Sequence, residues 1–415
     1  MPNSTSRRTF LKAASASAAA LSFTASSYGR IVGANDRISI GVVGCGVRGA
    51  KAHMPGVQEH AEEQNIEITA VCDPWRPRRE QAAAKTAEWY GRPARQFVSY
   101  RDVVALEDVD AVMIASCDHQ HTTHLKAAAE AKKDVYCEKP LAMDFEKLKA
   151  ACDAVTASGV VCQIGTQVRS RPTSTGCREL FKTGVLGHVS RVEQMRNGTR
   201  PYWYSRLQEA NENDVDFKEF LMDRPMRPFR ADQFTGWYGY RDFSDGPVPG
   251  YGAHFIDLMN YIIGTKVPES AVCLGGTYTW KDEHGFTCPD HVQATWTYPE
   301  GLLVSYTTNF GNSGGRSFRI FGEQGIINLT NWSAPSVSGE GAIRRGELKE
   351  ERPVDPVETP DHFLNWLKCI RSRKQPNAPI EAGYQHAVAV IMAMRAYDTG
   401  RRMVYDPEKR VLREG

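Results

Sequence analysis

Residues 38–49 read Ile-Ser-Ile-Gly-Val-Val-Gly-Cys-Gly-Val-Arg-Gly, an apolar run that ends in the pattern Gly-x-Gly-x-x-Gly. Between a strand and a helix, such a turn lets the backbone approach a pyrophosphate, and the helix N-terminus favours its negative charge. The pattern alone is weak, but here it directly follows a strand-like run. The residues expected at a dinucleotide are therefore Gly44, Cys45, Gly46, Val47, Arg48 and Gly49.

Apolar runs alternate with helical patterns from residue 35 to about residue 166. The apolar runs cover 38–43, 66–71, 111–115, 134–137 and 160–164, and helical patterns between them cover 78–90, 122–131 and 145–158. This alternation predicts βαβ units in a parallel sheet that is buried on both faces. We therefore expect residues 35–166 to form a Rossmann dinucleotide-binding domain.

Asp73 ends the second apolar run, 24 residues after Gly49. An acid at this place accepts a hydrogen bond from the adenosine ribose 2′-hydroxyl, which favours NAD. Arg76, Arg78 and Arg79 follow closely, and an arginine there can bind the 2′-phosphate of NADP. NAD is therefore the expected cofactor, and NADP stays open.

Two further motifs lie where apolar runs end. Ala-Ser-Cys-Asp-His-Gln-His (115–121) places Ser116, Asp118 and His121 in a loop expected to line the cofactor pocket. No cysteine or histidine partner at zinc-like spacing lies nearby, so no metal site is predicted. Glu138-Lys139-Pro140 ends the next run, and a desolvated lysine there can hold or pass a proton.

The order of these motifs resembles that of the Gfo/Idh/MocA oxidoreductases, and the resemblance extends over nearly the whole chain after residue 34. It implies a second α/β domain (residues 167–415) with an open, mostly antiparallel sheet that forms the oligomer interface. It also implies that Glu138 and Lys139 lie at the cofactor and that Lys139 contacts the substrate hydroxyl. The family's late Asp-x-x-x-His motif has its histidine at His254, and Asp257 matches a further acid.

The pattern after residue 185 agrees with such a sheet. Residues 292–298 alternate apolar and polar side chains, and runs at 302–310, 318–321 and 326–329 predict further strands and a hairpin. Residues 335–358 are polar and predict a loop. Residues 360–400 show helical spacing and could pack back on the first domain.

One position departs from the family. Gly250 stands where the family has the aspartate that binds substrate and positions the proton relay. This leaves Lys139 and His254 as the expected catalytic pair. Either Asp242 or Asp245 replaces the missing acid, or dehydrogenase activity is weakened, and the sequence does not decide between these alternatives.

The chemistry of alcohol oxidation assigns roles to this pair. A base must take the hydroxyl proton while a cofactor takes the hydride, and histidine suits the first task near neutral pH. A cationic Lys139 would stabilise the developing alkoxide. Residues 200–241 are dense in aromatic side chains, which suit sugar rings or simply pack a subdomain. The expected substrate contacts are Arg169, Tyr202, Trp237 and Asp257.

We therefore expect an NAD(P)-dependent oxidoreductase acting on a sugar, polyol or glycoside hydroxyl. The missing acid at position 250 keeps two alternatives open: a glycosidase that works by transient oxidation and elimination, and a non-catalytic sugar-binding relative. A net charge of +2 gives no basic field for nucleic acid. No apolar run reaches the 18 residues that would predict a membrane span.

The first residues predict export. Ser-Arg-Arg-Thr-Phe-Leu-Lys (6–12) precedes an Ala-rich stretch, which is typical of a twin-arginine signal for proteins exported in the folded state. The twin-arginine machinery of a bacterium is then expected to export the protein to the periplasm or the cell surface. The signal is expected to be cleaved near Ala34. Of the 10 cysteines, Cys45, Cys72, Cys117 and Cys137 end apolar runs and are expected to be buried thiols, with a Cys273–Cys288 bridge left open.

Overall fold

The computed structural model describes residues 36–415, so the expected export signal and its cleavage site lie outside the described residues. The first half forms a six-stranded parallel sheet in the order β3-β2-β1-β4-β5-β6, which confirms the predicted fold class. Its strands are β1 (Ile38–Val43), β2 (Ile66–Cys72), β3 (Arg95–Phe97), β4 (Ala111–Ile114), β5 (Asp134–Cys137) and β6 (Cys162–Ile164). Strand β3 was not predicted, because it is short and carries no apolar run.

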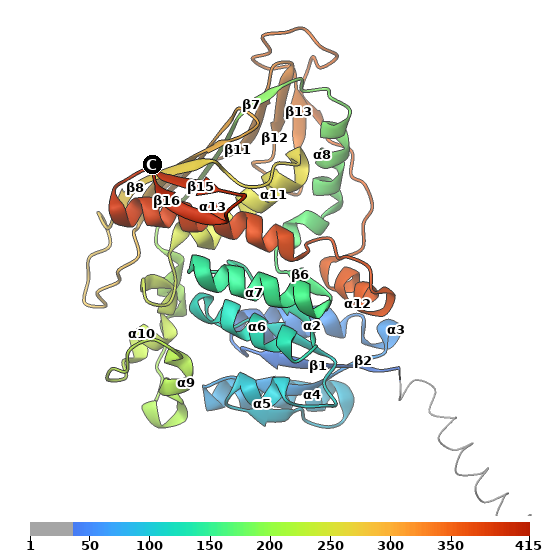
Figure 1. The fold of residues 1–415 in the computed structure, drawn as a ribbon, viewed down its shortest axis with the longest axis vertical. Coiled ribbons are helices and arrows are strands. Elements are labelled where there is room, and N and C mark those ends of the chain that lie inside the picture. Colours follow the sequence, from blue (N-terminus) through green and yellow to red (C-terminus); the bar gives the residue numbers. More distant parts are fainter. Residues whose placement is uncertain (1–35) are drawn as a thin grey trace, which may run out of the picture.

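Helices cover both faces of this sheet (Figure 1). They are the helical run of η1 (Gly49–His53) and α2 (Met54–Gln58), then α3 (Ala61–Gln64), α4 (Arg76–Tyr90), α5 (Tyr100–Val104), η2 (Asp118–Gln120), α6 (His121–Glu130) and α7 (Phe145–Ser158). The ends of α7 show why it forms there. Asp144 accepts a hydrogen bond from the Lys147 amide at 2.9 Å, and Gly159 ends the helix with φ +70°.

The second sheet has ten strands in the order β14-β13-β12-β11-β7-β10-β9-β8-β15-β16. Only the β7–β10 pair is parallel, which confirms the mostly antiparallel sheet. The strands are β7 (Val189–Gly198), β8 (Ser270–Gly276), β9 (His291–Tyr298), β10 (Leu302–Asn309), β11 (Asn312–Gly322), β12 (Gly325–Asn328), β13 (Ser336–Ser338), β14 (Arg352–Pro353), β15 (Met403–Asp406) and β16 (Val411–Glu414). The loop predicted for 335–358 was wrong in part, because β13 and β14 add two short polar strands at the sheet edge.

The two faces of this sheet differ. Buried residues such as Trp296 point to the face covered by η7 (Val248–Gly252), α11 (Ala253–Ile263) and α13 (Ile380–Thr399). The elements η3 (Gln167–Ser170) and α8 (Pro172–Lys182) pack against α11. The strand register places four exposed apolar side chains on the opposite face: Met195, Val272, Leu274 and Leu303.

The last two long helices connect the halves. Helix α12 (His362–Ser372) packs Trp366, Leu367 and Ile370 into an apolar cluster with β1, β2 and β4 of the first sheet. Helix α13 lies between α7 and the second sheet, and a single buried apolar cluster includes residues from β4, β5, α7, α11 and α13 together with strands of the second sheet. One face of the first sheet and the second sheet therefore share one buried apolar cluster. Figure 1 shows α13 between α7 and the second sheet.

Residues 202–246, called the cap segment below, extend from the second domain along the first (Figure 1). The segment contains η4 (Tyr202–Arg206), η5 (Glu212–Asp214), α9 (Phe217–Leu221), α10 (Ala231–Thr235) and η6 (Trp237–Gly239). It has its own aromatic cluster, in which Phe220 packs against Phe234 and Phe243. The Asp216 amide donates to Pro74 O at 2.9 Å, which fixes the cap segment to the loop after β2.

All 10 cysteines fall within the described residues and are free thiols. The Cys273–Cys288 bridge that the sequence left open is therefore not formed. Within residues 36–415, no helix is both long and apolar enough to cross a membrane.

Candidate active site

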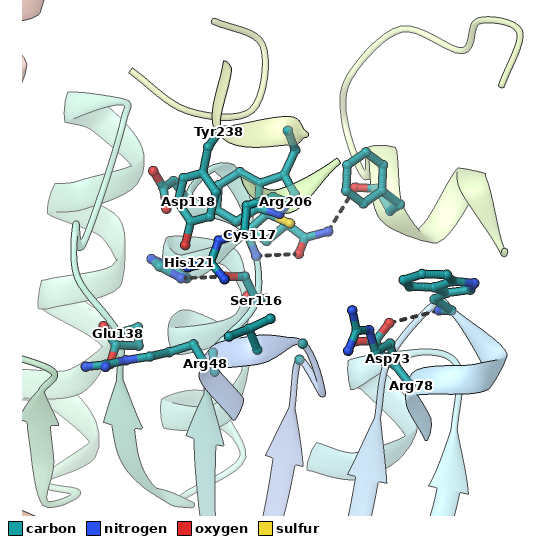
Figure 2. A pocket seen from close by; sticks show the side chains of 18 of the residues that line it. Arg48, Asp73, Arg78, Ser116, Cys117, Asp118, His121, Glu138, Arg206 and Tyr238 are labelled. Carbon is teal, nitrogen blue, oxygen red and sulfur yellow. Dashed lines mark hydrogen bonds and ion pairs between the residues drawn. The ribbon is translucent and has the colours of Figure 1, made fainter. Parts of the chain in front are cut away.

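A cavity of about 750 Å³ lies between the C-terminal ends of the parallel strands and the cap segment. In open α/β sheets this is the edge where ligands bind. Figure 2 shows the glycine loop and the strand ends on one side, with Tyr238 and Arg206 of the cap segment opposite. Of the residues expected from the sequence, the cavity is lined by Gly44, Gly46, Val47, Arg48, Asp73, Ser116, Asp118, His121, Glu138, Lys139, Tyr202, Trp237 and His254.

The three glycines of the loop differ in what a side chain would meet at each position. Gly44 has φ +95°, and a Cβ there would lie 2.5 Å from the Ser116 amide nitrogen. A Cβ at Gly49 would lie 2.0 Å from Gly44 O, so Gly49 permits the close packing of the helical run that follows. A Cβ at Gly46 would meet no atom within 4 Å. The open space at Gly46, beside a helix N-terminus, fits a pyrophosphate.

Asp73 is held by two backbone amides. Its Oδ2 accepts from the Cys45 amide at 2.8 Å and its Oδ1 from the Trp75 amide at 2.9 Å. Burial raises the pKa of Asp73, and these two hydrogen bonds oppose that shift. Asp73 lines the cavity and each oxygen keeps acceptor capacity, so the carboxylate can accept from a ribose hydroxyl.

The three arginines after Asp73 have partners in the protein. Arg76 pairs with Asp214, and Arg79 donates to the backbone oxygen of Asp73 at 2.6 Å. Arg78 lies 5.1 Å from the ring centroid of Trp75 and donates to Gln208 at 3.2 Å. A carboxylate at the ribose end, with these arginines engaged, favours NAD over NADP.

Glu138 is the centre of a buried network behind the glycine loop. Its Oε1 accepts from Arg48 Nε at 2.6 Å and from Gln167 at 2.9 Å, and lies 2.8 Å from His53 Nε2. Burial alone would raise the pKa of Glu138, but Arg48, His53 and Lys139 together hold it well below its usual value. Glu138 therefore stays ionised. It positions the Arg48 side chain and the backbone at Lys139, whose amide donates to Glu138 Oε2.

Lys139 and His254 lie on the wall of the same cavity. Lys139 Nζ donates to Gly250 O at 2.8 Å. Burial lowers the pKa of Lys139, while Glu138 and Asp118 oppose that shift. Burial, followed by the charge of Lys139, lowers the pKa of His254 well below its usual value. The imidazole of His254 is therefore neutral.

The loop after β4 fixes its polar side chains through separate partners. Asp118 is 3% exposed and accepts from Ser244 Oγ of the cap segment at 2.7 Å, and burial raises its pKa to about 7. His121 lies 2.8 Å from Pro140 O, and His124 lies 3.0 Å from Ser116 Oγ. Residues 36–415 contain no group of three or more His, Cys, Asp or Glu side chains arranged to hold a metal ion.

Four predicted site residues lie elsewhere. Cys45 and Gly49 are buried behind the loop and do not line the cavity. Arg169 and Asp257 form a buried ion pair, Nε to Oδ2 at 2.7 Å, and likewise do not line it. Each satisfies the other's charge inside the second domain, so the expected substrate contacts of this pair do not agree with the structure.

The site residues expected from the sequence do not include several residues that line the cavity. Trp75 at the adenosine end and Arg206, Phe220 and Tyr238 in the cap segment all contribute to the wall. The density of aromatic residues over 200–241 was the only sequence signal for the last three. Trp75 had no signal, because its place depends on how the cap segment folds over it.

Comparison with known proteins agrees with this geometry. Residues 38–166 match the oxidoreductase family with an NAD-binding Rossmann fold, and residues 219–404 match its C-terminal α/β domain. Inositol 2-dehydrogenase of Rhodococcus erythropolis is 31% identical over 385 residues, which cover 90% of this chain and 96% of that protein. The chain belongs to the Gfo/Idh/MocA oxidoreductase family.

Other Gfo/Idh/MocA relatives share less of their length or sequence. An uncharacterized oxidoreductase of Bacillus subtilis, YrbE, is 29% identical over 45% of this chain, and the match spans 53% of that protein. The WlbA dehydrogenase of Bordetella pertussis, solved with NADH and UDP-GlcNAcA, has a TM-score of 0.67 at 21% identity, covering 89% of this chain and 99% of that one. Levoglucosan dehydrogenase, solved with NADH, also has a TM-score of 0.67, at 18% identity over 88% and 98% of the two chains. These two structures support the fold.

Proposed function

We propose that this oxidoreductase transfers a hydride between NAD and a carbon bearing a hydroxyl or keto group on a sugar, polyol or glycoside. The observation that carries the proposal is that Lys139 and His254 line the same cavity as the glycine loop and Asp73. The names of the inositol and levoglucosan dehydrogenases support the substrate class.

The chain offers a distinct group for each part of the cofactor. The glycine loop and the helix N-terminus would hold the pyrophosphate, and Asp73 the adenosine ribose. Lys139, at the other end of the same wall, would lie at the nicotinamide side. When bound, the cofactor supplies the hydride acceptor, which no protein side chain provides.

The proton chemistry falls to Lys139 and His254. Lys139 already donates a hydrogen bond into the cavity wall, so a substrate hydroxyl can replace Gly250 O as its acceptor. A cationic Lys139 stabilises the alkoxide that forms as the proton leaves. His254, which lines the same cavity, is the proposed acceptor of that proton and returns it in the reverse reaction.

A substrate screen tests the proposal. The purified protein is incubated with NAD and a panel of sugars, polyols and glycosides, and NADH is followed by its absorbance. We expect net NADH formation with at least one compound, and a loss of about 10²-fold or more in rate for both Lys139→Ala and His254→Ala. Unchanged dinucleotide binding in these variants would separate a catalytic role from a cofactor-binding role. No dinucleotide binding at all in the wild-type protein would refute the proposal.

The first 34 residues support a proposal on location. We propose that the Arg7-Arg8 pair directs folded export with the cofactor already bound, and that cleavage occurs near Ala34. Fractionation of bacteria that express the wild type or the Arg7→Lys, Arg8→Lys double variant tests it. Export of both proteins in equal amounts would contradict the proposal.

A further inference from the structure

Gly250 lies in the cavity wall directly beside the lysine of the proposed catalytic pair. Its oxygen accepts from Lys139 Nζ at 2.8 Å, and its amide donates to Gly246 O at 3.0 Å. A group that fills the space at the α-carbon of residue 250 therefore lies next to the Lys139 ammonium, which would bind the substrate hydroxyl.

The hydroxyl of Tyr202 fills that space. A Cβ built on Gly250 would lie 2.3 Å from Tyr202 Oη and 3.1 Å from Cζ. Carbon and oxygen atoms do not approach to 2.3 Å without a bond, so any side chain at residue 250 would have to displace the phenol. Tyr202 and a side chain at position 250 are therefore mutually exclusive in this conformation.

Packing holds Tyr202 in this place. Its ring makes edge-to-face contacts with Trp203, Tyr238 and Tyr251 at centroid distances of 5.3, 5.4 and 5.1 Å. Its hydroxyl donates to Gly246 O at 3.2 Å, which leaves the oxygen lone pairs available as acceptors. Tyr202 also lines the cavity.

The phenol differs from an acid in charge. Burial, followed by the negative charge of Asp118, raises the pKa of Tyr202 well above its usual value, so the hydroxyl stays neutral. It can donate and accept hydrogen bonds but cannot serve as a base near neutral pH.

The two acids that the sequence offered as replacements lie elsewhere. Asp242 pairs with Arg227, and Asp245 lies 3.1 Å from Arg241. Neither side chain lines the cavity. Of the groups considered for position 250, only Tyr202 has its polar atom at the required place.

We propose that Tyr202 is a substrate-positioning residue whose hydroxyl takes the place of a side chain at residue 250, and that glycine is present there to admit it. This inference rests on the proposed function. The Tyr202 hydroxyl binds a substrate hydroxyl next to the one that Lys139 binds, and so orients the reacting carbon. Proton transfer remains with Lys139 and His254.

Three substitutions test the pairing after the screen has identified a substrate. Tyr202→Phe removes one oxygen and keeps the ring, so we expect kcat/KM for the substrate to fall by about 10- to 100-fold with the affinity for NADH unchanged. Tyr240→Phe is the matched control, because its hydroxyl donates to His284 O at 2.8 Å outside the cavity. Gly250→Ala, made in both the wild type and Tyr202→Phe, measures the coupling between the two positions.

The outcomes separate the possibilities. We expect Gly250→Ala to reduce kcat/KM by at least about tenfold more in the wild type than in the Tyr202→Phe background, because the contact with Oη is then absent. An unchanged kcat/KM in Tyr202→Phe, equal effects of Gly250→Ala in the two backgrounds, or a loss of NADH affinity in Tyr202→Phe would each overturn the inference. An inactive wild type that binds no dinucleotide would instead refute the proposed function.

Discussion

Arg48 Nε donates to Glu138 Oε1 at 2.6 Å, a bond that joins the glycine loop after β1 to the residue before Lys139. This hydrogen bond therefore connects the glycine loop, where the pyrophosphate would bind, to the strand end that carries Lys139. Figure 2 shows this pair beneath Ser116 and His121, at the strand ends.

Replacing Glu138 tests this connection. Glu138→Gln removes the negative charge that Arg48 and His53 face, so we expect a loss of about 2–4 kcal/mol in the free energy of unfolding and weaker NAD binding. Urea denaturation and NADH fluorescence titration measure the two effects. The exposed Glu146→Gln is the control, expected to change stability by less than about 1 kcal/mol. Equal stabilities of the two variants would contradict the role of Glu138.

Asp118 gives the stability a defined pH dependence. Its pKa in the folded protein is about 7, above the unfolded value, so its contribution is fully present below about pH 4 and is lost as the pH rises through 7. We expect the wild type to gain stability relative to Asp118→Asn as the pH falls from 8 to 5, by at most about 1.4 kcal/mol per pH unit. Urea titrations at four pH values measure the difference. Parallel pH profiles for the two proteins would exclude the raised pKa.

The carboxylate of Asp73 predicts the choice of cofactor. We expect the wild type to bind NADH at least about tenfold more tightly than NADPH, and Asp73→Ser to narrow or reverse that ratio. Fluorescence titration of both cofactors measures it. Asp108→Ser changes an exposed acid that pairs with Arg95 and serves as the control. A wild-type preference for NADPH would mean that one of the nearby arginines binds the 2′-phosphate.

The cap segment predicts slow release of the cofactor. Phe220 is 2% exposed, lines the cavity and packs against His119 of the first domain at 5.6 Å. We expect Phe220→Ala to loosen the segment and to raise the NADH dissociation rate by about tenfold or more. Stopped-flow displacement measures the rate, with Phe321→Ala on β11 as a control distant from the cavity. Equal rates in both variants would show that the segment does not retain the cofactor.

The open face of the second sheet predicts self-association. Leu274 is 76% exposed and shares this face with Val272, Leu303 and Met195. On this face the four apolar side chains alternate with polar ones such as Gln293 and Thr295. Such a mixed surface is compatible with a subunit interface, and we propose that it is covered by a second copy of the chain. Leu274→Glu is then expected to lower the molar mass measured by light scattering, with little change in the cofactor affinity. A wild-type protein that is already monomeric would refute the interface.

Short-range patterns predicted most of the first domain. The apolar runs and glycine pattern located β1, β2, β4, β5 and β6 and placed Asp73, Ser116 and Lys139 at one edge, because parallel strands end together. His254 lies in the cavity, as the family resemblance had implied.

Patterns failed where the answer depends on contacts between distant segments. Arg169 and Asp257 look like substrate ligands in the sequence, but they neutralise each other 2.7 Å apart. Tyr202 was expected as a substrate contact, but its contact with Gly250 was not predicted, because 48 residues separate them and no periodicity connects them. Only the fold of the cap segment brings that hydroxyl to the glycine.

The single apolar interior that runs through α13 has a consequence for motion. Two lobes with separate cores can open by rotation about a hinge, but here such a rotation would tear one packed interior apart and expose it to water. Nucleotide exchange would therefore depend on local detachment of residues 202–246 from the first domain rather than on a rotation of the two domains. The rate of nucleotide exchange can then change without a change in how rigidly the two domains are packed together.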